Sequence, residues 1–314
     1  MTPDRLLIAP EVSTALRDGT PVVALESTLI SHGLPYPQNI EVASASEAAV
    51  RESGAVAATV AIHDGRVLVG LDAAALHALA TAPAGSVRKA ARPSLAIALA
   101  EGGWAATTVS ATMIAAEAAG IRVFATGGIG GVHRGALGQP GRNRPATFDI
   151  SSDLEELGRT AVAVVCAGPK AILDVPATLE YLETRGVPVV AVGQPEVPGF
   201  YARSSGIKAP ASVPDIEAAA RLVALHFEAR VGGGVLVCTP PPADLAIPED
   251  EARAVVEQVI REAEAEAIDG PAVTPWLLQR IAVVTEGRFV RTNTALIIND
   301  ARVAGALAAS LATT

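Results

Sequence analysis

Three lysines stand out in this 314-residue chain, because the other 21 of its 24 lysine and arginine residues are arginines. Lysine can become a neutral amine nucleophile, whereas arginine keeps its proton. Lys170 follows the apolar run TAVAVVCAG and a proline, where a desolvated amine could form a Schiff base. An ordinary surface lysine at a helix start is the alternative. Lys89 lies between Arg88 and Arg92, which indicates a basic patch that binds an anion.

A carboxylate, Glu26, follows the apolar run PVVAL directly, and Ser27, Thr28, Ser31 and His32 come soon after it. Open α/β sheets place their ligands at the carboxyl ends of their strands. A carboxylate at such a place is suited to proton transfer. The alternative is a helix N-terminus that Ser27 or Thr28 caps.

A second polar string, TFDISSD, contains two acids and two serines: Asp149, Ser151, Ser152 and Asp153. Carboxylates and hydroxyls suit a hard cation such as Mg²⁺ or Mn²⁺. Alternatively, Ser152 or Asp153 caps a helix that runs through Leu157. Zinc is not expected, because the chain has no CxxC, HExxH or paired-histidine spacing.

Four glycines in five residues follow the strand-like run VFA, in the segment Thr126–Arg134. Clustered backbone N–H groups can bind an anion, with His133 and Arg134 as flanking donors. A tight turn that needs positive φ is the alternative. The spacing matches neither a P-loop nor GxGxxG, so it favours a phosphate or sugar phosphate over a nucleotide cofactor.

The elements that must position these residues alternate between apolar β-runs and helical patterns, which predicts an α/β fold on a largely parallel sheet. The expected strands are 21–25, 56–62, 105–109, 122–125, 161–166, 188–192 and 235–238. The expected helices are 39–51, 73–80, 94–100, 111–119, 177–185, 214–227, 249–267, 275–284 and 294–311. His63–Arg66 predicts a two-residue Asp-Gly hairpin, which makes the sheet mixed. We expect one large domain over residues 1–314, with a helical portion from about Glu249 that caps the core.

The composition excludes several classes of protein. A net charge of -9 argues against a general nucleic-acid binder. Cys166 and Cys238 lie in apolar runs, which predicts buried thiols in a reducing compartment. The start of the chain lacks the pattern of a signal peptide, and charges interrupt the long apolar stretches. We therefore expect a cytoplasmic protein with no membrane partner.

Several long strings, taken together and in order, resemble the pseudouridine-5′-phosphate glycosidase family, also called pseudouridylate synthase or indigoidine synthase A-like. The resemblance extends from about residue 10 to about residue 310. The strings that carry it are VVALESTLISHGLPYPQN, ATTVSATM, FATGGIGGVHRG, TFDISSDLEEL, VVCAGPKAILDVPATLEYLET, PWLLQRIAVVTEG and TNTALIINDARVAGALA.

The resemblance implies reversible cleavage of the C–C glycosidic bond of pseudouridine 5′-phosphate to uracil and ribose 5-phosphate, as a step of pseudouridine catabolism. By motif, Lys170 is the nucleophile that forms a covalent adduct at ribose C1′, and Glu26 is the proton donor. Asp149 is the ligand of a divalent metal, typically Mn²⁺. The family also implies a three-layer α/β/α fold and a homotrimer. The implied or expected substrate-binding residues are Lys89, Val109, Thr126, His133, Arg134, Ser151, Ser152 and Asp153.

Cleavage of a C–C glycosidic bond needs these residue types. An ordinary glycosidase uses two carboxylates and protonates a heteroatom leaving group. Uracil leaves through carbon, so an amine that opens the sugar and becomes an iminium supplies the electron sink. One neutral lysine, one proton shuttle and a bound phosphate meet this need.

One departure from the family pattern is the insertion Leu137–Ala146, which contains Arg142 and Arg144. It is either a lid that adds cations over the phosphate or a tolerated surface extension.

Two other functions remain alternatives. One is a sugar or nucleoside kinase, against which the missing P-loop argues. The other is a non-catalytic sugar-phosphate-binding protein or an accessory protein of pigment biosynthesis.

Overall fold

The central sheet has eleven strands in the computed structural model, which describes residues 1–138, 146–266, 268 and 273–313. Only β3 pairs antiparallel, with β4 and β6, and the other strand pairs of this sheet are parallel. The mostly parallel, mixed sheet is therefore confirmed. In spatial order its main path is β1 (Leu6–Ile8), β4 (Arg66–Val69), β3 (Val56–His63), β2 (Val22–Leu25), β7 (Val123–Ala125), β9 (Ala163–Cys166), β13 (Val235–Cys238), β11 (Val189–Val192) and β12 (Ala211–Val213). Beside β3 lie β6 (Ala105–Thr107) and then β5 (Arg88–Ala90).

The central strands are buried on both faces, which explains their continuous apolar sequences. In β2, Val22 and Ala24 pack into one core, and Val23 and Leu25 pack into the other. The expected buried thiols are confirmed, since Cys166 and Cys238 are free, buried and paired across β9 and β13.

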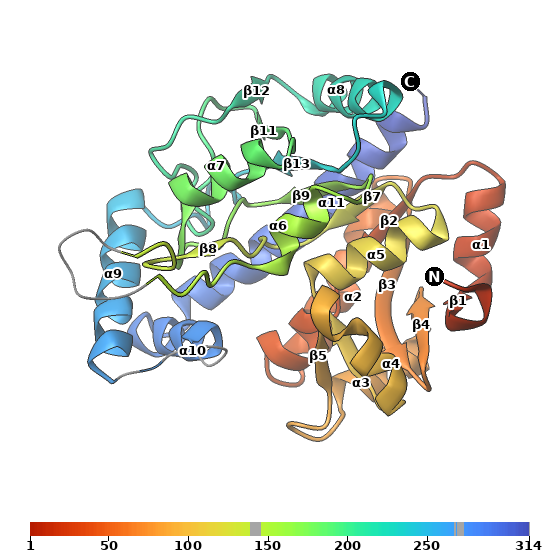
Figure 1. Ribbon diagram of the computed structural model, residues 1–314, viewed down its shortest axis with the longest axis horizontal. Coiled ribbons are helices and arrows are strands. Elements are labelled where there is room, and N and C mark those ends of the chain that lie inside the picture. The colour runs from red at the N-terminus through yellow and green to blue at the C-terminus, as the bar shows by residue number, and fades with distance from the viewer. Residues whose placement is uncertain (139–145, 267, 269–272, 314) are drawn as a thin grey trace.

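Helices cover both faces of the sheet, which confirms the three-layer α/β/α architecture (Figure 1). One core contains residues of α1 (Pro10–Arg17), α5 (Val109–Ala119), α6 (Ser152–Leu157) and α7 (Val175–Thr184). The other contains residues of α2 (Gln38–Glu52), α8 (Ile216–Ala229) and α11 (Arg288–Leu311). Near the β5 end of the sheet lie α3 (Ala73–Ala80) and α4 (Leu95–Glu101).

The C-terminal helices differ from the expected cap. A separate apolar cluster around Phe289 joins α9 (Glu249–Ala265) and α10 (Val273–Val284). In contrast, α11 crosses the molecule as part of a covering layer and packs on α2, β2, β7 and β9 (Figure 1). By length and composition α11 could span a membrane, and 39% of its most apolar window is buried inside the protein. Its packing on the sheet is that of a core helix.

Element boundaries also differ from the expectation in places. The strand expected to reach Val109 ends at Thr107, and α5 begins at Val109 after an extended Thr108. The hairpin is confirmed, because His63 pairs with Arg66. The helix α1 and the short strands β1, β5, β8 (Val132–His133), β10 (Leu173–Asp174) and β12 were not predicted, whereas α6 was predicted as an alternative. Two or three residues are too few to show a period.

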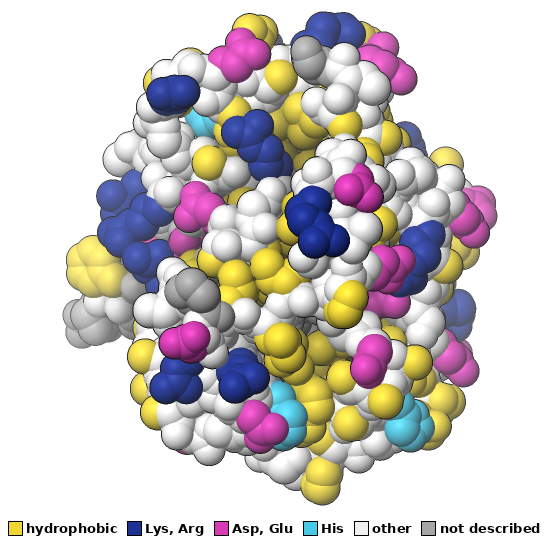
Figure 2. All heavy atoms as spheres, turned by 90° about the vertical axis from the view of Figure 1, so that its right-hand side faces the viewer, with side chains coloured by type: hydrophobic (Ala, Val, Ile, Leu, Met, Phe, Trp, Pro, Cys, Tyr) yellow, Lys and Arg dark blue, Asp and Glu magenta, His cyan; other side chains and the backbone are white. Residues whose placement is uncertain are grey.

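The face of the molecule at the right of Figure 1 carries basic and acidic side chains side by side (Figure 2). Among the residues coloured there, lysines and arginines do not gather into one field of the kind that attracts nucleic acid. Exposed apolar side chains lie between the charges on this face.

Candidate active site

Polar and charged side chains converge on a cavity of about 170 Å³ beyond the carboxyl ends of several parallel strands. Parallel strands bring such residues together because their carboxyl ends lie at one edge of the sheet. The segments that follow β2, β7 and β9 meet for this reason. The segments that follow β5 and β6, which run in the opposite direction beside β3, also contribute, and so does the start of α6. The lining residues are Glu26, Thr28, Lys89, Ala91, Thr108, Val109, Gly130, His133, Ser151, Ser152, Asp153, Lys170, Ile172 and Leu173.

The cavity contains two of the three lysines of the chain, Lys170 and Lys89. Lys170 lies in the turn after β9, where its backbone N–H donates to the Ile129 carbonyl over 3.1 Å. Lys89 lies in β5 and also lines the cavity. Burial, followed by the charge of Lys170, lowers the pKa of Lys89. The positive charge of Lys89 is therefore held close to that of Lys170, in a place suited to an anion.

The Glu26 carboxylate is held by two threonine hydroxyls. Thr28 donates to Oε2 and Thr126 donates to Oε1. The alternative that Ser27 or Thr28 caps a helix is wrong, because the short helical segment Leu29–Gly33 has no side-chain cap. Instead, Ser27 Oγ accepts a hydrogen bond from the Thr107 backbone N–H over 2.9 Å. Of the two threonines bonded to Glu26, Thr28 lines the cavity and Thr126 does not.

The start of α6 presents Ser151, Ser152 and Asp153 to the cavity. Ser151, and not Ser152 or Asp153, is the N-cap, and its Oγ accepts from the Asp153 N–H over 3.2 Å. The Asp153 side chain is buried and accepts two backbone hydrogen bonds. The Ser110 N–H donates to Oδ1 over 3.0 Å and the Gly130 N–H donates to Oδ2 over 2.9 Å. Asp153 thus joins three segments of the cavity wall.

In the glycine-rich segment after β7, four of the backbone N–H groups that the sequence assigned to an anion are bonded within the protein. The backbone N–H groups of Ile129, Gly130, Val132 and His133 all donate to protein acceptors. The alternative, a tight turn that needs glycines with positive φ, is wrong, because none of the four glycines has a positive φ. Their role is close packing: a Cβ on Gly130 would lie 2.8 Å from Asp153 Oδ2, and one at the other three would also overlap neighbouring atoms.

The two residues that end this segment point in different directions. His133 lines the cavity. Arg134 does not, and its guanidinium donates to the Ala171 carbonyl over 3.4 Å. Arg134 instead lines a second cavity, of about 410 Å³, near the N-terminus of α9. The segment Pro169–Leu173 separates the two cavities and contributes residues to both.

Asp149, the expected metal ligand, lies beside the cavity and is about half exposed. Its Oδ2 is 3.7 Å from Nδ1 of His133, with 47% of the Asp149 side chain accessible. The described residues contain no group of three or more His, Cys, Asp and Glu side chains that could hold a metal. Asp149 therefore fits a hard cation that keeps most of its water ligands, and not a cage of protein ligands.

The insertion begins and ends close to these residues. The backbone N–H groups of Thr147 and Phe148 both donate to the Ala136 carbonyl over 2.9 Å, which closes the base of the loop. Arg142 and Arg144 lie outside the described residues, so the lid stays a prediction.

The structure adds cavity residues that the sequence analysis missed, among them Ala91, Thr108 and Ile172. Thr108 could have been found, because it is a hydroxyl residue near the end of the predicted strand 105–109. Ala91 and Ile172 carry no chemical signal, and only the fold brings them to the cavity.

The sandwich and its lysine- and carboxylate-lined cavity define an α/β protein with a site for a small anionic molecule. The chain belongs to the indigoidine synthase A-like family, whose description is "Indigoidine synthase A like protein" and which it matches over residues 11–310. It is 54% identical to a pseudouridine-5′-phosphate glycosidase of Paracoccus denitrificans, over 99% of this chain and 100% of that protein. A protein of the same name from Solibacter usitatus is 52% identical over 98% of this chain and 99% of its own length.

Solved structures share the fold. The prealnumycin C-glycosynthase AlnA, in complex with ribulose 5-phosphate, superposes with a TM-score of 0.89 at 36% identity, covering 99% of this chain and 98% of that one. An indigoidine synthase A-like protein from Thermotoga maritima superposes with a TM-score of 0.83 at 33% identity, covering 98% and 96%.

Proposed function

We propose that this protein cleaves the C–C glycosidic bond of pseudouridine 5′-phosphate, reversibly, to give uracil and ribose 5-phosphate. The observation that carries the proposal is the meeting of Lys170, Lys89 and Glu26 in one cavity. The names of its full-length relatives and the sugar phosphate bound by the C-glycosynthase support the same substrate class.

The proposed reaction uses Lys170 as the nucleophile. Its Nζ attacks ribose C1′, the C1′–O4′ bond breaks, and a proton passes from the attacking nitrogen to O4′. A proton from Glu26 is then added to the uracil carbon that is bonded to C1′. The C1′–C bond breaks as the nitrogen lone pair forms an iminium, and uracil leaves. Water hydrolyses the iminium, which releases ribose 5-phosphate, restores the amine and sets free a proton that returns to Glu26.

The remaining residues would bind and orient the substrate. Lys89 supplies a positive charge to the sugar phosphate, and the hydroxyls of Ser151 and Ser152 supply hydrogen bonds. The two threonine hydroxyls that donate to Glu26 hold its carboxyl group in place. A divalent cation at Asp149, which we expect to be Mn²⁺, would neutralise negative charge on the substrate when bound.

Trapping of the adduct tests the mechanism. Incubation with pseudouridine 5′-phosphate and Mn²⁺, followed by borohydride, should give a reduced sugar adduct on Lys170 that mass spectrometry detects. Lys170→Ala should form no adduct and release no uracil. Release of uracil at an unchanged rate by Lys170→Ala would exclude the mechanism. Binding without turnover by the wild type would favour the non-catalytic alternative.

The metal, the assembly and the location are further parts of the proposal. Asp149→Asn should raise the Mn²⁺ concentration that gives half-maximal activity, and chelation should abolish activity until Mn²⁺ is restored. We expect a homotrimer, which sedimentation equilibrium would detect as three times the 31.8 kDa chain mass. We also expect a cytoplasmic enzyme of pseudouridine catabolism.

A further inference from the structure

We infer that Arg92 and Glu156 are positioning residues, whose ion pair holds the strand that carries Lys89 against the helix that carries Asp153. The inference rests on the proposed function for the reaction that Lys89 assists. Neither residue lines the cavity, so both act through the residues that they hold in place.

Lys89 needs such support because its strand is short and peripheral. β5 has three residues and, among the strands that the structure describes, pairs only with β6. A three-residue edge strand with one neighbour holds its side chains weakly. Lys89 nevertheless must keep its amine at a fixed place relative to Lys170 and Glu26, across the cavity.

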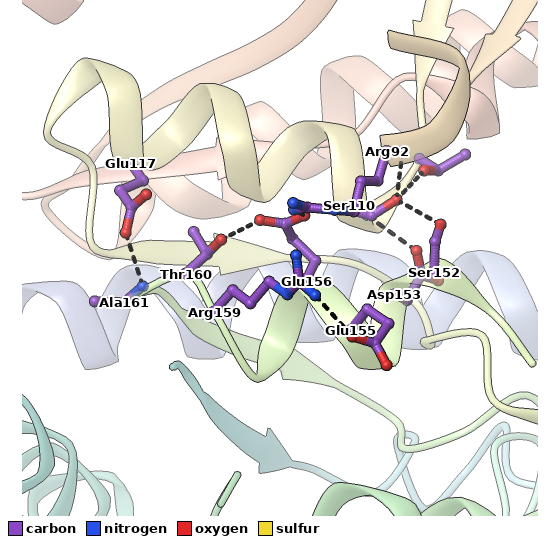
Figure 3. A network of polar contacts seen from close by, with 11 residues as sticks. Arg92, Ser110, Glu117, Ser152, Asp153, Glu155, Glu156, Arg159, Thr160 and Ala161 are labelled. Atoms are coloured by element: carbon purple, nitrogen blue, oxygen red, sulfur yellow. Dashed lines mark hydrogen bonds and ion pairs between the residues drawn. The ribbon is translucent and has the colours of Figure 1, made fainter. Parts of the chain in front are cut away.

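Arg92 ties this segment to the rest of the site in two ways (Figure 3). Its backbone N–H donates to Ser110 Oγ over 3.1 Å. Its guanidinium donates to Oε2 of Glu156. The Glu156 side chain is only 2% exposed, and its other oxygen accepts a hydrogen bond from Thr160. A buried carboxylate needs a partner of this kind, because an unpaired buried charge is strongly destabilising.

The same contacts lead back to the cavity wall. The Ser110 N–H donates to Asp153 Oδ1 over 3.0 Å, and Ser110 Oγ lies 3.2 Å from Ser152 Oγ (Figure 3). Asp153 and Ser152 both line the cavity. Arg92 therefore bonds at once to the first turn of α5, through Ser110, and to the C-terminal end of α6, through Glu156. The pair fixes Lys89 relative to Ser152 and Asp153.

Glu155 offers a matched control on the same helix. It precedes Glu156 and also makes an ion pair, with Arg185, and accepts a hydrogen bond from Tyr181. These partners lie on or next to α7, away from the Lys89 strand. Loss of Glu155 therefore perturbs α6 without releasing β5.

The experiment compares Glu156→Gln, Arg92→Lys and Glu155→Gln in the full chain. For pseudouridine 5′-phosphate we expect Glu156→Gln to lower kcat/KM by about tenfold to hundredfold, mainly through KM, because small misplacements of binding groups cost that much. For Glu155→Gln, kcat/KM should stay within about twofold of the wild-type value, even if its melting temperature falls as much as that of Glu156→Gln. Arg92→Lys keeps one charge and should retain more activity than Arg92→Ala.

A second readout does not depend on turnover. Acetylation of Lys89 at a series of pH values, followed by peptide mass spectrometry, measures the pH at which its amine becomes reactive. The charged groups that face Lys89 are Lys170, Glu26 and Asp153, with His32 nearby. The pH midpoint of acetylation should shift upward in Glu156→Gln, as Lys89 becomes more solvated, and should not change in Glu155→Gln.

The outcomes separate the two proposals. Equal effects of Glu156→Gln and Glu155→Gln on kcat/KM and on acetylation would overturn the positioning role. Absence of uracil release by the wild type would overturn the proposed function, and the acetylation midpoints would still decide the positioning role. If Glu156→Gln does not fold, Arg92→Lys carries the comparison, since the Arg92 side chain is 36% exposed.

Discussion

The two oxygens of Glu26 each accept a hydrogen bond from a different threonine, and these threonines differ in their relation to the cavity. Thr28 lines the cavity, whereas Thr126 approaches Glu26 from outside it. Lys89 is the other residue of the site with a distinctive environment, because burial and Lys170 lower its pKa. Each feature can be tested with one substitution.

Thr126→Val should lower kcat by roughly tenfold and leave KM nearly unchanged, because it removes one hydrogen bond to a charged group that acts in the chemical step. Steady-state kinetics with pseudouridine 5′-phosphate measure both constants. Thr184→Val, whose exposed hydroxyl bonds within α7, is the control. A larger change in KM than in kcat would assign Thr126 to substrate binding instead.

Lys89→Met should raise the melting temperature at pH 7, by an amount that shrinks as the pH approaches 10.5. The lowered pKa means that the folded protein binds fewer protons than the unfolded chain between the folded pKa and the ordinary lysine value of 10.5. The cost is complete below the folded pKa and disappears above 10.5. Thermal melts from pH 7 to pH 10.5 measure it, with the exposed Lys208→Met as the control. A difference that does not vary with pH would contradict this account.

The glycine-rich segment and α6 show which elements the sequence could predict. Apolar runs predicted the seven main strands. The helix α6, whose N-cap is Ser151, was predicted as an alternative. The strand that carries Lys89 was not, because Arg88–Ala90 has no apolar period. Contacts such as Thr126 with Glu26, a hundred positions apart, depend on strand order, which no local pattern encodes.

Packing of the glycine-rich segment against α6 predicts the effect of Gly130→Ala. The added Cβ would overlap Ser151 and lie 2.8 Å from Asp153 Oδ2, which would displace the start of α6. We expect a loss of about 1–3 kcal/mol in the free energy of unfolding and a large fall in kcat/KM.

Gly103→Ala is the matched control for this substitution, because its Cβ would meet no atom within 4 Å and its φ is not positive. Denaturant titration and kinetics measure both variants. Equal stability and activity of the two would show that the close approach at Gly130 has no effect.

The last helix of the chain completes the fold of the whole molecule. Residues of α11, including Leu307 and Ala304, pack in the same core as Val23 of β2 and Val165 of β9. The sequence predicted this helix but placed it in a peripheral cap, since periodicity shows that one face is apolar and not what covers that face. Many contacts of this core thus join the two ends of the chain, which is typical of slow-folding topologies.

Leu307→Ala should destabilise the protein by about 2–5 kcal/mol, because it leaves a cavity in this core. Leu225→Ala removes the same atoms from a side chain of α8 that is 65% exposed, and should change stability by about 0.5 kcal/mol or less. Urea titrations measure the two free energies. Similar values for both would contradict the central position of α11.

The hydrogen bonds that close the insertion at Ala136 make it suitable for loop engineering. Because Thr147 and Phe148 are fastened to Ala136, the spacing of His133 and Asp149 does not depend on how many residues lie between Ala136 and Thr147. The entropy of a closed loop changes only with the logarithm of its length, by about 0.6 kcal/mol for each doubling. Foreign peptides grafted between Ala136 and Thr147 should therefore leave the separation of His133 and Asp149 unchanged.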